Sequence, residues 1–256
     1  MSFLERACRQ AWERVRRGYY DVGWRQDAEP PSLVDNLTSR PALICEVKRS
    51  SPTMGRIRPD LRIGEALEEI RRGGGDAVSI LTDPDNFQGS LRDLKHASES
   101  SGLPTLMKDF IVSERQIEAA WRSGASAILL IYPVFKRGLS SISLREAINT
   151  AHSLGLEVIL EVFDGGLGEA LDTDSDLVGV NSRNLDTLEV DLWRAYRMIK
   201  EYEGDAWRIV AESGIRSPHD VRTFMELGVS RFLVGTSIMS SRSISSKIRE
   251  LKEGAT

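Results

Sequence analysis

Two charged residues interrupt an apolar stretch near the start of the chain, which reads ICEVKRSSPTMG at residues 44–55. In an extended strand residues i and i+2 share a face, so Glu46 and Lys48 are expected to point the same way. Burying two charges in such a strand costs several kcal/mol unless they pair or serve a function. The stretch therefore predicts a site in which these charges neutralise each other or act on a ligand.

Polar groups of the same kind recur at the ends of later apolar stretches. On strand alternation Lys108 shares a face with Leu106 and Phe110, and Glu161 ends another such stretch. Equivalent positions are occupied by Asn181, Arg183, Glu212 and Ser213. Three carboxylates, two lysines and an arginine can share an apolar interior only if they compensate one another around a polar site. A salt-bridge network that merely plugs the interior is the structural alternative.

Eight short apolar stretches, rich in β-branched residues, would position these groups. They lie at residues 42–48, 77–82, 104–110, 126–132, 157–162, 177–183, 208–213 and 231–236. Segments with helical apolar spacing, such as GEALEEIRRG and SERQIEAAWRSG, separate them. This alternation predicts a parallel sheet covered on both faces, and eight units predict a closed (β/α)8 TIM barrel, an α/β fold forming a single domain over residues 1–256. A doubly wound open sheet is the competing fold.

Residues 1–40 lie outside this repeat and predict an N-terminal helical extension of one or two helices that caps the barrel and partly covers its C-terminal mouth. An apolar stripe of helical spacing is formed by Leu4, Cys8, Ala11, Trp12, Val15 and Tyr19. The other face carries Arg6, Arg9, Arg14, Arg16 and Arg17. These arginines either form a solvated face or bring one guanidinium near an anionic ligand at a barrel mouth. PPSLVDNL at residues 30–37 predicts a second short helix.

Glycines after the seventh and eighth stretches suit a bound phosphate. ESGI (212–215) and VGTS (234–237) place backbone N–H groups where they can approach an anion. Loops after strands seven and eight are the usual phosphate site of this fold. Each glycine alone is typical of an ordinary strand-to-helix turn, whereas the two loops together predict an anion site.

Composition and charge exclude several classes of function. The 256 residues carry a formal net charge of −4 with acids and bases interspersed, which gives no indication of nucleic-acid binding. Cys8 and Cys45 lie far apart and the three histidines are scattered, so no metal site is predicted. No signal-peptide core and no apolar run of membrane-spanning length is present, so we expect a cytoplasmic protein with reduced cysteines and no membrane contact.

Six motifs resemble those of the indole-3-glycerol-phosphate synthase family. They are EVKRSSP (46–52), LMKDF (106–110), LEVILEV (156–162), GVNSRNL (179–185), AESGI (211–215) and FLVGTSIM (232–239), in order over roughly residues 3–245. The resemblance implies a carboxy-lyase of tryptophan biosynthesis acting on 1-(2-carboxyphenylamino)-1-deoxyribulose 5-phosphate. The ring carbon that bears the carboxylate would attack the sugar ketone, with loss of carbon dioxide and then water. No cofactor is expected, because no redox step occurs.

The resemblance also implies roles for the charged residues. Lys108 would protonate the ketone oxygen, and Glu46 and Glu161 are the candidates to balance its charge. Lys48 and Glu161 would form the second acid–base pair, in an order that the sequence leaves open. Arg183 offers a planar fork for the benzoate carboxylate. The sugar hydroxyls and the two lysines would be held by Asn181, Glu46, Glu212 and Ser213.

Two further groups of residues would bind the ends of the substrate. The phosphate would lie on Ser51, Gly214, Gly235 and Thr236 or Ser237, mostly through backbone groups. The aromatic ring would need an apolar slot, made by Phe87, Phe110, Leu129 and Ile131. For Leu129 and Ile131 ordinary barrel packing explains the residue type equally well.

One loop departs from the family pattern, and two rival functions stay open. Phe163 stands where the family often has histidine, and DGG follows at 164–166, which predicts an altered loop but unchanged chemistry. The nearest rival enzyme is a phosphoribosylanthranilate isomerase, which usually uses a cysteine and an aspartate. The rival from another class is a non-catalytic phosphosugar-binding protein. Contacts with other pathway enzymes and the oligomeric state are not readable from the sequence.

Overall fold

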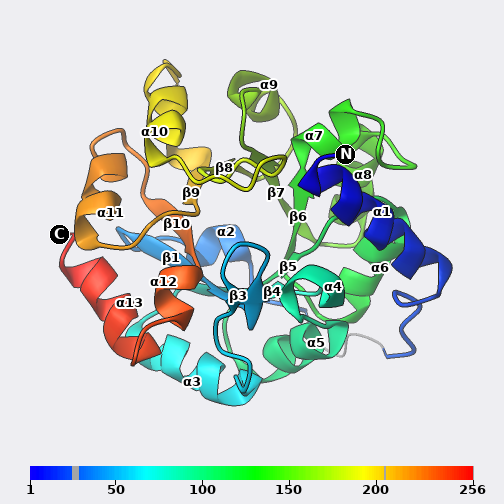
Figure 1. Ribbon diagram of the computed structural model, residues 1–256, viewed down its shortest axis with the longest axis horizontal. Coiled ribbons are helices and arrows are strands. Elements are labelled where there is room, and N and C mark those ends of the chain that lie inside the picture. The colour runs from blue at the N-terminus through cyan, green and yellow to red at the C-terminus, as the bar shows by residue number, and fades with distance from the viewer. Residues whose placement is uncertain (25–28, 205, 256) are drawn as a thin grey trace.

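Eight parallel strands close into a barrel in the computed structural model, which describes residues 1–24, 29–204 and 206–255 (Figure 1). The strands are β1 (Ala42–Val47), β4 (Ala77–Leu81), β5 (Thr105–Lys108), β6 (Ala127–Ile131), β7 (Glu157–Val162), β8 (Leu177–Asn181), β9 (Ile209–Glu212) and β10 (Arg231–Val234). Their order around the barrel is β1-β10-β9-β8-β7-β6-β5-β4. Because β1 pairs with both β10 and β4, the predicted closed barrel is confirmed and the open sheet is excluded.

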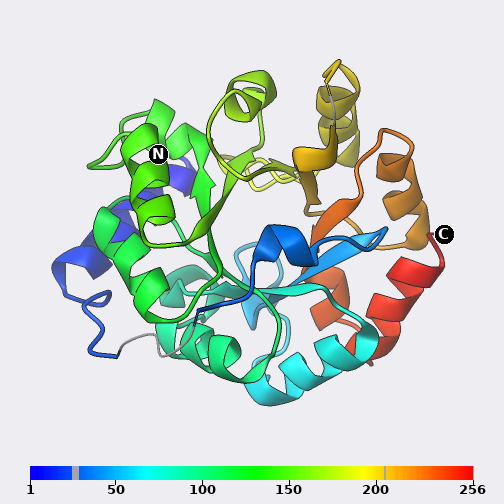
Figure 2. The ribbon, with the colours of Figure 1, turned by 180° about the vertical axis from the view of Figure 1, so that it is seen from behind.

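Helices cover the outside of the barrel (Figures 1 and 2). They are α3 (Ile63–Gly73), α5 (Leu91–Ser100), α6 (Glu114–Arg122), α8 (Leu144–Ser153), α9 (Leu167–Leu171), α10 (Leu192–Lys200), the 3₁₀ helix η1 (Ala206–Arg208), α11 (Pro218–Met225) and α13 (Ile244–Glu253). Capping boxes begin α6 and α8, where Ser113 and Ser143 exchange hydrogen bonds with Gln116 and Glu146. Within the described ranges no helix is both long and apolar enough to cross a membrane.

Short elements follow several strands at the end of the barrel that carries the expected site. They are the hairpin of β2 (Ser50–Ser51) and β3 (Gly55–Arg56), α4 (Pro84–Phe87), α7 (Tyr132–Lys136) and α12 (Thr236–Met239). Figure 1 shows the hairpin, α4 and α12 in front of the barrel. The strands end up to two residues earlier than predicted, so Lys48, Arg183 and Ser213 lie just beyond β1, β8 and β9. These side chains therefore belong to the mouth of the barrel.

The N-terminal extension is divided between the two ends of the barrel. α1 (Phe3–Arg16) lies on the loops at the carboxyl ends of the strands, where the Leu4 amide donates to the Leu185 carbonyl at 3.0 Å. α2 (Leu33–Asn36) lies at the opposite end, where the Leu33 amide donates to the Glu157 carboxylate at 2.7 Å (Figure 2). Glu157 begins β7 and satisfies N–H groups that a helix start leaves free. α2 therefore does not share the capping position expected for residues 1–40.

One arginine of α1 is buried rather than solvated. The Arg14 side chain is 8% exposed and its guanidinium lies 3.3 Å from Asp83, 3.2 Å from Asp109 and in contact with Asp85. The Tyr20 hydroxyl donates to the same Asp109 carboxylate at 2.9 Å. Arg14 thus does not belong to the expected basic face, because it compensates two carboxylates buried in the loops after β4 and β5.

Replacing Arg14 with Met should destabilise the protein strongly, because Asp83 and Asp109 would stay buried without their cation. Breaking a buried ion pair from one side costs about 3–5 kcal/mol of unfolding free energy. Urea denaturation measures the loss. Arg9→Met, at an exposed position of the same helix, is the control and should change the free energy by less than about 0.5 kcal/mol. Equal stability of the two variants would contradict this account of Arg14.

Candidate active site

Lys108, the last residue of β5, lies between two buried carboxylates. Its Nζ is 2.8 Å from Glu161 Oε2 on β7 and 3.1 Å from Glu212 Oε2 on β9. Each of these carboxylates is 1% exposed. The sequence suggested Glu46 and Glu161 as the partners of Lys108, but the direct partners are Glu161 and Glu212. Glu46 instead forms an ion pair with Lys48.

The barrel itself explains this grouping. Glu46, Lys108, Glu161 and Glu212 come from β1, β5, β7 and β9, which are the first, third, fifth and seventh strands of the barrel in chain order. Inward side chains of a TIM barrel stack in layers of four that come from alternate strands. The uppermost layer of this barrel, which we call the charged layer, is therefore made of three acids and one base.

The charges of this layer shift one another's protonation. Burial alone would lower the pKa of Lys108, but Glu161, Glu212 and Glu46 outweigh it and raise that pKa above its usual value. Burial raises the pKa of Glu212 to about 8, although Lys108 opposes the shift. Burial also acts to raise the pKa of Glu46, yet Lys48 and Lys108 bring it below its usual value. Lys108 is therefore an ammonium at neutral pH, and Glu212 can hold a proton there.

Two glycines leave room for the carboxylates. A Cβ on Gly179 of β8 would lie 2.1 Å from Glu212 Oε1, and a Cβ on Gly235 after β10 would lie 2.3 Å from Glu46 Oε1. Both contacts are far below any van der Waals distance, so a side chain at either position must displace its carboxylate. Gly235 was expected only as a backbone ligand of an anion, and the structure gives it this additional task.

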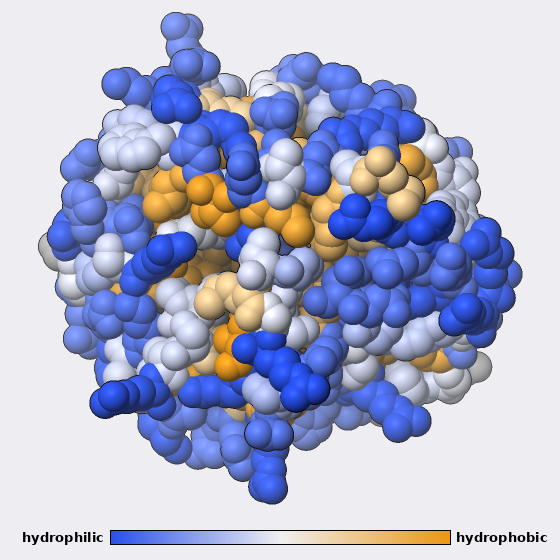
Figure 3. Space-filling model, in the orientation of Figure 1, coloured by the Kyte–Doolittle hydropathy of each residue, from blue (hydrophilic) through white to orange (hydrophobic). Residues whose placement is uncertain are grey.

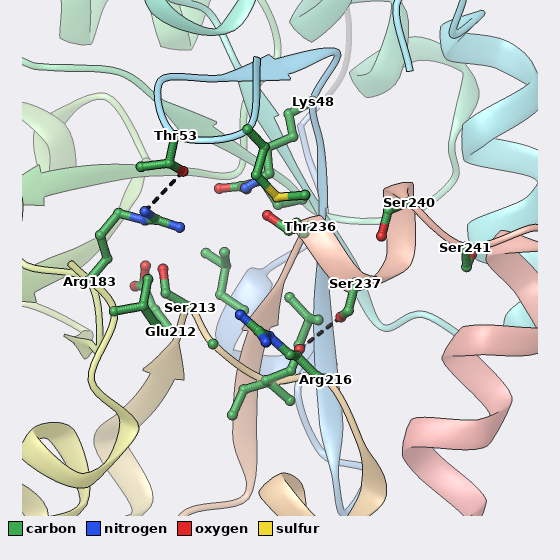
Figure 4. A pocket seen from close by; sticks show the side chains of 18 of the residues that line it. Lys48, Thr53, Arg183, Glu212, Ser213, Arg216, Thr236, Ser237, Ser240 and Ser241 are labelled. Carbon is green, nitrogen blue, oxygen red and sulfur yellow. Dashed lines mark hydrogen bonds and ion pairs between the residues drawn. The ribbon is translucent and has the colours of Figure 1, made fainter. Parts of the chain in front are cut away.

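Arg183 crosses the mouth of the barrel beyond β8. Its guanidinium donates to the Leu188 carbonyl at 2.9 Å and to the Thr53 hydroxyl at 3.3 Å (Figure 4). Its amide donates to Asn181 Oδ1 at 2.8 Å, which orients the Asn181 side chain. Because Thr53 belongs to the hairpin after β1, Arg183 connects the loops of the first and sixth barrel strands.

A cavity of about 750 Å³, here the large cavity, opens beside the charged layer (Figure 4). Of the residues expected to bind phosphate, it is lined by Gly214, Gly235, Thr236 and Ser237. Ser213 and Gly214 have φ of 62° and 77°, so the β9 loop turns through two left-handed residues, one of them a strained non-glycine. The Ser237 hydroxyl donates to the Ile215 carbonyl at 2.8 Å and so joins the two glycine loops.

Ser51 is placed differently from the other expected phosphate residues. Its hydroxyl accepts a hydrogen bond from the Met54 amide at 3.2 Å and thereby stabilises the turn of its own hairpin. It lines neither the large cavity nor the smaller one described next.

A smaller cavity of about 70 Å³, here the apolar slot, adjoins the charged layer. It is lined by all the residues expected to hold the aromatic ring, Phe87, Phe110, Leu129 and Ile131. The rings of Phe87 and Phe110 stack with centroids 6.4 Å apart. Both cavities are lined by Glu46, Lys48, Lys108, Arg183 and Ser213. The charged groups therefore stand where an apolar and a polar compartment meet.

Sequence reasoning missed several residues of the large cavity. Arg216 lines it directly after the ESGI turn, and Lys247 reaches it from α13. Met54 and Val190 are apolar lining residues that are 57% and 38% exposed, and Figure 3 shows apolar surface toward the centre of this face. Arg216 directly follows the AESGI motif, which could have pointed to it. Phe163 is fully buried and lines neither cavity.

Fold and site together define a class of protein, the (β/α)8-barrel enzymes that hold an acid–base cluster beside a cavity able to accept an anion. Residues 9–251 match the indole-3-glycerol phosphate synthase family. The chain is 38% identical to that enzyme of Koribacter versatilis over 244 residues, covering 95% of this chain and 88% of the relative. It is 41% identical to the enzyme of Methanothermobacter marburgensis over 216 residues, covering 82% and 74%. The chain belongs to the indole-3-glycerol phosphate synthase family, carboxy-lyases of tryptophan biosynthesis.

More distant structures share the fold alone. Thiamine phosphate pyrophosphorylase from Pyrococcus furiosus superposes with a TM-score of 0.62 at 16% identity, over 88% of this chain and 98% of that one. This likeness supports the barrel and carries no conclusion about the reaction.

Gly179→Ala should displace the Glu212 carboxylate and so disturb the charged layer. A misplacement of about 1 Å in such a site lowers kcat by about 100-fold, and overpacking costs about 1–3 kcal/mol of stability. Steady-state kinetics and urea denaturation measure the two effects. Gly168→Ala on α9, where a Cβ meets no atom within 4 Å, is the control and should keep wild-type kcat. A folded Gly179→Ala with unchanged kcat would show that the Glu212 position is unimportant.

The raised pKa of Glu212 should make stability depend on pH. The folded protein keeps this proton up to about pH 8, whereas an unfolded glutamate releases it near 4.5. Between these values the folded state binds more protons, so this group lowers the unfolding free energy as the pH rises. Glu212→Gln should flatten that decline in urea denaturations between pH 5 and 8, and the exposed Glu114→Gln should not. Parallel profiles for all three proteins would refute the assignment.

Proposed function

We propose that this chain closes the indole ring of 1-(2-carboxyphenylamino)-1-deoxyribulose 5-phosphate with Lys108 as the general acid. The ring carbon that bears the carboxylate attacks the sugar ketone, the ketone oxygen takes up a proton, and carbon dioxide and then water leave. The observation that carries the proposal is the place of Lys108, which lines both the apolar slot and the large cavity and contacts two buried carboxylates.

The acid role of Lys108 follows from its environment. As the carbon–carbon bond forms, negative charge develops on the ketone oxygen, and a positioned donor stabilises it. An isolated buried lysine would lose its proton, but the three surrounding glutamates keep the ammonium charged. Glu161 and Glu212 also fix the direction of the ammonium, so little reorganisation is needed when the reaction occurs.

The loss of water requires a second acid–base system, and Lys48 and Glu161 are proposed for it. Lys48 contacts Glu46 and Glu161 contacts Lys108, so the two groups do not pair directly with each other. Both line the apolar slot, where a bound intermediate can touch each of them. Which of the two gives the proton and which takes it stays open.

The remaining parts of the substrate suit the two cavities. The phenyl ring would lie in the apolar slot, in contact with Phe87 and Phe110. Its carboxylate would meet the Arg183 guanidinium, which lines both cavities. The sugar hydroxyls would contact Asn181 and the charged layer. The phosphate would lie on the glycine loops of the large cavity, at Gly214, Gly235, Thr236 and Ser237.

One observation counts against the isomerase alternative. Cys45 faces outward from the barrel, since a Cβ on Gly75 would lie 2.9 Å from its sulfur and 2.6 Å from Ile70 of α3. It therefore cannot reach a substrate in the cavities. A phosphosugar-binding protein without catalysis would need the cavities but not an ammonium held by two buried carboxylates.

We also propose that the protein works in the cytoplasm on a small-molecule substrate, without nucleic-acid or membrane partners. Cys8 and Cys45 are both buried free thiols, as is usual for proteins of a reducing compartment. The net charge of −4 offers no attraction to nucleic acid.

Lys108→Met should lower kcat by about 10²–10⁴-fold with a much smaller change in KM, because a positioned acid acts mainly in the transition state. Formation of indole product from the carboxyphenylamino substrate, followed by absorbance or fluorescence, measures both constants. Lys200→Met, on the exposed surface of α10, is the control and should match wild type. A folded Lys108→Met that keeps more than about a tenth of wild-type kcat would falsify the assignment.

A further inference from the structure

The basic side chains of the large cavity fall into two groups. Lys48 is paired with Glu46, Lys108 with Glu161 and Glu212, and Lys247 lies 2.7 Å from Glu250. These ammonium groups are already neutralised by the protein. They can take part in catalysis, but none offers an uncompensated positive charge to a ligand.

Two guanidinium groups of the same cavity have no carboxylate within ion-pair distance in the described part of the chain. Arg183 is held by neutral oxygens of Thr53 and Leu188. The backbone amide of Arg216 donates to the Asp220 carboxylate at 2.9 Å, while its side chain makes no hydrogen bond or ion pair with any described residue. In Figure 4 the Arg216 guanidinium points into the cavity.

The two arginines line different compartments. Arg183 borders the apolar slot as well as the large cavity, whereas Arg216 borders only the large cavity, beside Gly214 and Ser237. The proposed substrate carries two anionic groups, a benzoate carboxylate attached to the ring and a phosphate at the far end of the sugar. The two guanidinium groups without carboxylate partners thus match the two anionic groups of the substrate in number and in placement.

We propose that Arg216 is the side-chain cation that binds the substrate phosphate and selects phosphorylated over unphosphorylated substrate. This inference rests on the proposed function. The glycine loops supply backbone donors, and Arg216 supplies the full positive charge that such donors lack. Arg183 is then left to the carboxylate.

The electrostatics of the large cavity agree with this division. Burial lowers the pKa of Arg183, Glu46 opposes the shift, and the charge of Arg216 lowers the pKa further. The two guanidinium groups therefore repel each other until anions enter between them. Since the phosphate does not react, its contact with Arg216 is equally strong in the ground state and the transition state, and the effect belongs in KM rather than kcat.

Arg216→Gln, Arg216→Lys and the control Arg145→Gln, an exposed arginine of α8, test the proposal. Because the Arg216 side chain is exposed, we expect Arg216→Gln to raise KM by only about 10-fold, at the lower limit for a charged hydrogen bond, with kcat within about 2-fold of wild type. The KM of Arg216→Lys should lie between those of wild type and Arg216→Gln. The inhibition constant of inorganic phosphate should rise by a similar factor, and that of anthranilate should stay constant.

The unphosphorylated substrate analogue gives the sharpest comparison. Arg216→Gln should leave its kcat/KM unchanged, so that the preference of the enzyme for the phosphorylated compound falls about 10-fold. Equal losses with both compounds would indicate a structural defect and overturn the proposal, as would an unchanged KM.

Calorimetric titration with inorganic phosphate separates this inference from the function on which it rests. If the wild-type protein forms no indole product, the proposed function fails. Weaker phosphate binding by Arg216→Gln than by wild type and Arg145→Gln would still support the site. Equal phosphate affinity in all three proteins, in an enzyme that does form product, would overturn the role of Arg216 alone.

Discussion

The Lys108 ammonium, held by Glu161 and Glu212 inside the barrel, is the interaction on which the rest of the site depends. A charge this deeply placed is tolerated only when opposite charges surround it closely. Two carboxylates for one ammonium would leave an excess of negative charge, and the raised pKa of Glu212 shows how the site responds, by favouring one proton on the pair. The site therefore holds a charged ammonium on Lys108 and favours a proton on Glu212 at the same time.

Barrel geometry makes this arrangement available and also restricts it. Residues from alternate strands meet in one layer, so a single polar position at the end of each of four strands produces a compact cluster. The intervening strands must then stay small at the level of the carboxylates. Gly179 and Gly235 meet that demand, although glycine weakens a strand and contributes nothing to the core. The charged layer therefore depends on the two glycines, because a side chain at either position would occupy the space of a carboxylate.

The barrel strands and the members of the charged layer could be predicted from the sequence, because both depend on local patterns of residues. Continuous apolar stretches give the eight strands, and polar residues at their ends give the members of the cluster. The pairing within the cluster could not be predicted, because alternation fixes the face of a side chain but not its height in the barrel. Lys108 was accordingly assigned Glu46 rather than Glu212 as a partner.

Contacts between residues far apart in the chain account for the other differences between the sequence predictions and the structure. From the sequence, Arg14 is one more surface arginine on an amphipathic helix. Only the fold brings it to Asp83 and Asp109. The sequence predicts that α2 is part of the cap. The hydrogen bond from its Leu33 amide to Glu157 shows that it lies at the opposite end of the barrel. In each case the deciding partner lies many residues away in the chain.

The distribution of charge finally separates chemistry from recognition. The lysines at the centre are paired within the protein, so an entering substrate does not have to supply their counterions, and the proposed acid, Lys108, stays in place. Arg183 and Arg216 at the rim have no carboxylate partner among the residues that the structure describes, and a guanidinium keeps its charge in any protein environment. In the proposed mechanism an anionic substrate is thus attracted to the outer groups while the inner ones face its neutral ketone. If the central lysines were the unpaired cations, phosphate or carboxylate would bind to them and block the proton transfer proposed for Lys108.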